Sequence, residues 1–172
     1  MNHPSTSRPA QPLYTLEQRK RRDSSPWTMV QGILAPLQFL VFAVSLVLVL
    51  AFLSTGEYFA AATASIVLKT LLLYTIMVTG AIWEKEVFGQ YLFAPGFYWE
   101  DVVSMLVLAL HTAYLAAWYF TLATPKAQMF LALAAYATYA INATQFLLKL
   151  RQARLQPNTN MAHHLMPEMT RS

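Results

Sequence analysis

Four long apolar stretches dominate the chain, at about 33–53, 58–83, 102–123 and 127–148. A helix crosses the hydrocarbon core of a bilayer with about 20 predominantly apolar residues, so each stretch is long enough to span a membrane. The connections between the first and second and between the third and fourth are short, which makes consecutive helices antiparallel neighbours. The pattern predicts an all-α integral membrane protein with four transmembrane helices in an up-down bundle.

The composition supports this interpretation over a soluble helical fold. Of the 172 residues, 56% are hydrophobic and 12% are charged, whereas about 25% of a soluble domain is charged. The net charge of +4 is typical of basic residues beside membrane spans, which set topology and contact anionic headgroups, rather than of nucleic-acid binding. The chain has no cysteine, which excludes disulfides, thiolate catalysis, Cys-ligated zinc and iron–sulfur clusters.

Three regions follow from this pattern. Residues 1–30 form a polar, basic leader, which is too long before the first apolar stretch for a cleaved signal peptide. Within it, Thr15 is expected to cap a short interfacial helix. Residues 31–150 form the transmembrane domain, and residues 151–172 form a polar tail in which paired histidines are ordinary tail residues.

Lysines and arginines set the predicted orientation. The leader carries five, the segment from Lys149 to the end of the chain carries four, and the connection 83–101 adds Lys85, whereas the opposite connections hold only Lys126. An even number of spans puts both termini on one side. We therefore expect both termini and residues 83–101 in the cytoplasm.

Polar side chains recur on one face of each stretch and could converge on the bundle axis. The stripes contain Gln31, Gln38 and Ser45; Lys69, Gly80 and Glu84; Asp101, Ser104 and His111; and Thr138, Asn142, Gln145 and Lys149. Such groups either mark functional sites or hold helices together at about 0.6 kcal/mol per hydrogen bond.

Two of these residues carry a distinct hypothesis. His111 lies near mid-membrane and is expected to be neutral, either as a packing residue or as an axial ligand to a metal. Lys69 either extends outward to the surface or binds an anionic ligand group or a carboxylate.

The connection 83–101 is the segment richest in candidate chemistry. Seven of its nineteen residues are aromatic and four are acidic: Glu84, Glu86, Glu100 and Asp101. An aromatic belt accounts for one or two aromatics per helix end, and acids at a helix start complement its dipole. The high density of aromatic and acidic residues in this connection instead indicates a site with flat apolar walls and groups that exchange protons. No nucleotide-binding or nucleophile motif is present, so nothing in the sequence suggests that the protein uses a nucleotide.

Much of the chain resembles the 3-vinyl bacteriochlorophyllide hydratase family of phototrophic bacteria. The resemblance covers about 13–155 and is carried by Leu13–Thr15, 21–23 (RRD), 25–28 (SPWT), 30–42 (VQGILAPLQFLVF), 69–85 (KTLLLYTIMVTGAIWEK), 87–95 (VFGQYLFAP), 97–102 (FYWEDV), 109–114 (ALHTAY), 134–139 (AAYATY) and 148–154 (LKLRQAR). It implies that water adds across the C3 vinyl group of a magnesium chlorin or bacteriochlorin, in bacteriochlorophyll synthesis. The magnesium belongs to the substrate, so no further cofactor is implied. The resemblance also implies the inner membrane of a bacterium as the location, and other enzymes of bacteriochlorophyll synthesis as partners.

The reaction that the resemblance implies needs an acid at the terminal vinyl carbon and an oriented water at the inner one. A carboxyl group in an apolar aromatic pocket can keep its proton near neutral pH, and an ionised one can take a proton from water. We nominate Glu84 and Asp101, which end two helices that face the same loop, with Glu86 and Glu100 in reserve. The expected substrate-binding residues are His111 (as a ligand to the substrate magnesium), Lys69, Trp83, Tyr91, Trp99 and Asn142.

One difficulty is that His111 lies about 15 Å along the helix from Asp101, at 1.5 Å per residue. Either the pigment enters the bundle, or one of the two assignments fails.

Two other functions fit the sequence. A non-catalytic carrier of chlorin pigments would use the same aromatic loop but would not depend on its carboxylates. A small transporter could run an ion path through Lys69, His111 and Asn142. Transporters often show internal repeats and broken helices, and this chain has no clear repeat between its halves.

Overall fold

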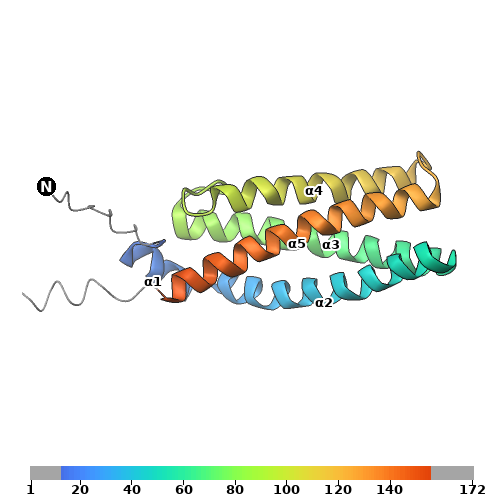
Figure 1. Cartoon of the computed structure of the whole chain (residues 1–172). Coiled ribbons are helices and arrows are strands. Elements are labelled where there is room, and N and C mark those ends of the chain that lie inside the picture. The colour runs from blue at the N-terminus through green and yellow to red at the C-terminus, as the bar shows by residue number, and fades with distance from the viewer. Residues whose placement is uncertain (1–12, 156–172) are drawn as a thin grey trace, which may run out of the picture.

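The computed structural model describes residues 13–155, which form five helices. Helix α1 (Leu16–Ser24) is short, and four long helices follow: α2 (Pro26–Thr55), α3 (Phe59–Phe88), α4 (Tyr98–Tyr119) and α5 (Pro125–Leu155). The long helices lie side by side (Figure 1). Residues 56–58 and 120–124 connect them at one end, and α1, residues 89–97 and the end of α5 lie at the other (Figure 1).

All four long helices are long and apolar enough to cross a membrane. Many of their large apolar side chains are exposed, among them Val47, Leu71 and Val78. An apolar outer surface of this extent is expected where lipid, not water, surrounds the helices. The fold therefore confirms the expected all-helical protein with four candidate spans.

The helix ends differ from those that the apolar stretches predicted, because capping residues decide them. Thr15 and Gln18 form a capping box at the start of α1, which confirms the short helix in the leader. Ser25 caps α2, whose first residue is Pro26, so this helix starts well before the apolar stretch. Gly89, at φ +87°, ends α3. The connection predicted at 83–101 therefore shortens to a loop at 89–97.

The interior is built from two closely packed helix pairs. Helix α2 packs most extensively on α3, and α4 packs on α5, whereas α3 and α4 contact each other less. The core divides into three clusters along the bundle. Their buried members are Val49, Ala62, Ile66, Tyr114, Met129, Ala132 and Tyr136; then Leu73, Val107 and Tyr139; and, at the end near α1, Tyr14, Val87 and Phe97.

Candidate active site

A pair of buried carboxyl groups lies where α3 ends and α4 begins. The Glu84 side chain is on the penultimate turn of α3, and Asp101 is on the first turn of α4. Each residue is at most 5% exposed, and the two side chains are hydrogen-bonded to each other. A hydrogen bond between two carboxyl groups requires a proton on one of them. At least one of the two groups is therefore protonated in this arrangement, and the fold brings these two nominated residues together.

The loop 89–97 supplies backbone donors to this pair. The Phe93 N–H donates to Asp101 Oδ2 at 2.7 Å, and the Ala94 N–H donates to Glu84 Oε2 at 3.3 Å. Ala94 also starts a tight turn that the Phe97 N–H closes on the Ala94 carbonyl at 2.7 Å. Because charged acceptors form the shorter and stronger hydrogen bonds, the shorter contact favours ionised Asp101 and leaves the proton on Glu84.

The two reserve carboxylates have other partners. Glu100 is buried, and both of its carboxylate oxygens accept from Lys149 Nζ at 2.9 Å, which joins the start of α4 to α5. Glu86 is exposed and accepts from Ser25 Oγ at 2.8 Å, at the start of α2. These contacts tie helices together, and they give both residues hydrogen-bond partners outside the carboxyl pair.

The aromatic residues of this region divide into two sets. Trp83, Phe88 and Phe97 pack edge-to-face or tilted against one another, with ring centroids 5.7–5.8 Å apart. They form part of the core, and Trp83 Nε1 also donates to Thr28 Oγ1 at 2.9 Å. A second set stays exposed: Tyr91, Phe93, Tyr98 and Trp99. Of the three aromatics predicted to bind substrate, Trp83 is therefore mostly committed to packing, whereas Tyr91 and Trp99 are accessible.

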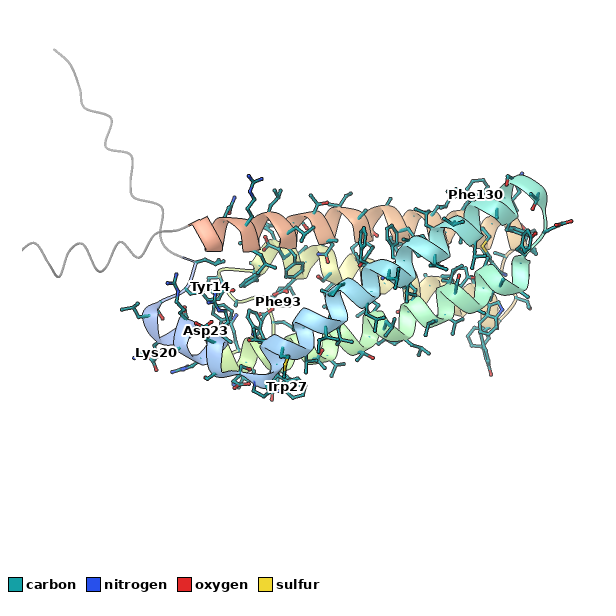
Figure 2. The ribbon with its side chains drawn as sticks, turned by 90° about the horizontal axis from the view of Figure 1, so that it is seen from below. Tyr14, Lys20, Asp23, Trp27, Phe93 and Phe130 are labelled. Atoms are coloured by element: carbon teal, nitrogen blue, oxygen red, sulfur yellow. The ribbon has the colours of Figure 1, made fainter. Side chains whose placement is uncertain are left out.

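The segment before α1 covers the packed set. Tyr14 is 7% exposed and stacks on Phe88, with centroids 5.7 Å apart and planes 17° apart. Burial raises the pKa of the Tyr14 phenol, and the Arg22 guanidinium, 4.9 Å from the ring centroid, opposes that rise. Nothing in the pattern of apolar and polar residues predicted this contact. Figure 2 shows Tyr14 and Phe93 at the same end of the bundle.

The mid-membrane residues lie in the packed interior, away from the carboxyl pair. Lys69 is fully buried, and its Nζ donates to Gln38 Oε1 at 2.9 Å and lies 3.6 Å from the Tyr139 ring centroid. The alternative in which this side chain extends outward is wrong, because an amide and an aromatic face inside the bundle hold the ammonium group. A carboxylate pairing for it is also wrong among residues 13–155.

His111 and Asn142, the other two residues predicted to bind substrate, lie at different depths in the bundle. His111 is fully buried, and Nδ1 donates to the Val107 carbonyl at 2.8 Å, which leaves Nε2 as the acceptor. Asn142 donates to the Glu100 carbonyl at 2.9 Å and accepts from Ser104 Oγ at 3.2 Å. Asn142 thus fastens α5 to the first turn of α4, close to the carboxyl pair but with its amide already bonded.

The described residues contain no cluster of three or more His, Asp or Glu side chains that could hold a metal ion. The chemistry that the arrangement supports is proton transfer, because the carboxyl pair can both donate and accept a proton.

Comparisons with known proteins agree with this chemistry. The 2-vinyl bacteriochlorophyllide hydratase family matches residues 14–152. A protein of Rhodobacter capsulatus named 2-vinyl bacteriochlorophyllide hydratase is 70% identical over 156 residues, which is 91% of each chain. A protein of the same name from Cereibacter sphaeroides is 70% identical over 155 residues, 90% of this chain and 96% of the relative. No solved structure matches.

These names give the vinyl group the number 2, whereas the family named in the sequence analysis gives it the number 3. With the family matched over nearly all of the described residues and two relatives at 70% identity, the chain belongs to the 2-vinyl bacteriochlorophyllide hydratase family.

Proposed function

We propose that this chain is a hydro-lyase of bacteriochlorophyll biosynthesis that adds water to the vinyl group of a bacteriochlorophyllide-type pigment at Glu84 and Asp101. The observation that carries the proposal is the buried, proton-sharing carboxyl pair beneath an aromatic loop. Hydration needs one proton donor and one proton acceptor on the same substrate group, and the pair supplies both.

In the proposed reaction Glu84 gives its proton to the terminal vinyl carbon. The cation that forms at the inner carbon is conjugated with the macrocycle and lies near the Asp101 carboxylate, which stabilises it. Water bonds to the inner carbon through its oxygen and loses a proton to Asp101. That proton then crosses the hydrogen bond to Glu84, so the pair returns to its starting state and the product is a 1-hydroxyethyl group.

The pigment is proposed to bind at the loop end of the bundle. The interior between this end and His111 is filled by Leu73, Val107 and Tyr139, which are at most 8% exposed. His111 is also about 15 Å from Asp101 along α4. We therefore propose that His111 and Lys69 stabilise the bundle, and that the pigment contacts Tyr91 and Trp99 in the exposed aromatic set. The magnesium arrives within the substrate, and the reaction needs no further cofactor.

The proposed setting is the inner membrane of a bacterium, with the helices up and down and both termini in the cytoplasm. The support is the distribution of basic residues: α1 carries four, and Lys149 and Arg151 lie at the same end of the bundle. This orientation puts the carboxyl pair at the cytoplasmic face, where water and a pigment from other bacteriochlorophyll-synthesis enzymes can reach it. The same basic residues would contact anionic lipid headgroups.

A labelling experiment tests the function. Membranes of a non-photosynthetic bacterium that expresses the chain are incubated with 3-vinyl bacteriochlorophyllide in heavy-oxygen water, and the pigment is examined by mass spectrometry. A product heavier by one labelled water supports the hydratase, and the double variant E84Q/D101N should leave the pigment unchanged. Pigment that co-purifies with the wild-type chain but is never hydrated would instead favour a carrier.

A further inference from the structure

An exposed aromatic surface lies directly beside the carboxyl pair. Phe93, Tyr98 and Trp99 are 39%, 47% and 69% exposed, and we call these three side chains the aromatic face. The ring centroids of Phe93 and Tyr98 are 5.8 Å apart, and those of Tyr98 and Trp99 are 5.4 Å apart. Three adjoining rings form one continuous apolar surface at the end of the bundle near α1.

Phe93 connects this surface to the site. Its φ is +61°, a backbone conformation that a bulky side chain rarely adopts. In this conformation its N–H donates to Asp101 Oδ2 at 2.7 Å, while its ring contacts Tyr98 on the outside. Unfavourable backbone conformations persist where the surrounding structure enforces them, and they cluster at functional sites.

We propose that the aromatic face is the surface on which the pigment macrocycle stacks, with Phe93 as the residue that places the vinyl group over the carboxyl pair. This rests on the proposed reaction at Glu84 and Asp101. A flat conjugated ring is the ligand that adjoining aromatic side chains suit best, because aromatic systems attract one another in offset and edge-to-face arrangements. A single residue, Phe93, spans the distance from the stacked ring to the reacting carboxylate.

A membrane-interface belt is the other explanation for exposed aromatics. A positive φ does not distinguish the two, because the exposed Tyr58 at the opposite end of the bundle has φ +68°. The 2.7 Å contact of the Phe93 N–H with the buried Asp101 carboxylate does, since a belt requires no such contact. The opposite end of the bundle provides the comparison: Tyr119 and Phe120 are 75% and 62% exposed and pack edge-to-face with centroids 5.0 Å apart. They lie about 27 Å from Asp101 along α4, so Phe120→Ala is a matched control.

The test measures binding and turnover separately. The full chain is reconstituted in lipid nanodiscs, and its affinity for the 1-hydroxyethyl product is measured, since that pigment undergoes no further hydration. We expect Phe93→Ala to raise both the product Kd and the substrate KM about fivefold, as for the loss of one aromatic stacking contact. Phe93→Tyr should restore both constants, and Phe120→Ala should leave them unchanged. Phe93→Gly keeps the N–H, accepts the positive φ and lacks the ring, so it should bind as weakly as Phe93→Ala.

The outcomes separate this proposal from the proposed reaction. Wild-type affinity in Phe93→Ala would overturn the aromatic face, whatever the carboxyl variants do. Equal weakening by Phe120→Ala would also overturn it and would assign both sets of rings to the membrane interface. Weak binding by Phe93→Ala together with full activity of E84Q and D101N would retain the aromatic face and reject the carboxyl mechanism.

Discussion

Replacing Glu84 with glutamine removes the acidic proton of this side chain but keeps its size and shape. Glutamine has nearly the same size, its amide oxygen can accept from the Ala94 N–H, and its amide nitrogen can donate to Asp101. The two hydrogen bonds of the native side chain are therefore retained. The variant lacks only an acidic proton, so its effect on turnover measures general-acid catalysis.

The expected magnitude follows from that single loss. General acid–base catalysis contributes typically about 10²–10⁴-fold, so Glu84→Gln should lower kcat about 10³-fold, or about 4 kcal/mol at 1.36 kcal/mol per tenfold. KM should change less than about twofold, since the pigment is proposed to stack on the aromatic face rather than on Glu84. With its hydrogen bonds replaced, the free energy of unfolding should change by at most about 1 kcal/mol.

The assay is the initial rate of vinyl hydration in membranes, followed by the absorbance change of the pigment and checked by mass spectrometry. Glu86→Gln is the matched control, because it lies two residues further along the same helix and contacts Ser25 instead of the pair. It should keep full activity. The wild-type rate should also fall as the pH rises, because hydroxide removes the shared proton, and Glu84→Gln should lose that dependence. A Glu84→Gln enzyme that retains more than about a tenth of wild-type kcat would refute the assignment of the acid.

Three further substitutions test the surroundings of the pair. Lys149→Met leaves the Glu100 carboxylate buried without its cation, so the thermal unfolding temperature in detergent should fall by several degrees. Adding Glu100→Gln removes the unpaired charge and should recover part of that lost temperature. If the double variant recovers nothing, the ion pair makes no net contribution to stability. Lys69→Met should keep hydratase activity within about twofold, because an apolar side chain of similar volume can replace a buried charge; loss of activity with an intact fold would return Lys69 to the site. Gly96→Ala places a Cβ 3.1 Å from Leu13 Cδ1, the end of a flexible side chain, so activity should be retained, and a large loss would show that the loop tolerates no adjustment there.

The sequence predicted the membrane fold well because hydrophobic length alone identifies a spanning helix. It placed the helix ends less well, since these depend on caps. Ser25 and Pro26 start α2 ahead of its apolar stretch, and Gly89 extends α3 beyond Trp83. Hydropathy carries no information on either effect.

The carboxyl pair was predictable, but the roles of the other two acids were not. Residues two apart on a helix point about 200° apart, so Glu84 and Glu86 cannot face the same partner. Which of them faces α4 depends on how α3 is rotated in the bundle. Glu100 likewise acquires its role from Lys149, on a helix that is distant in sequence. The donor N–H of Phe93 was also beyond prediction, because a left-handed backbone at a phenylalanine has no sequence signature comparable to glycine.

Tyr14 offers the sharpest test of whether packing around the loop supports catalysis. Its ring stacks on Phe88 and contacts Phe97, the residue that closes the turn from Ala94. Tyr14→Ala should create a cavity there and destabilise the fold by about 3 kcal/mol, as for other buried aromatics. The N–H donors of the loop would then be held less firmly against the carboxyl pair, so kcat should fall about tenfold while KM stays nearly constant. Tyr14→Phe keeps the ring and should restore kcat; if it fails to do so, or if KM alone changes in Tyr14→Ala, then Tyr14 does not act by positioning the loop.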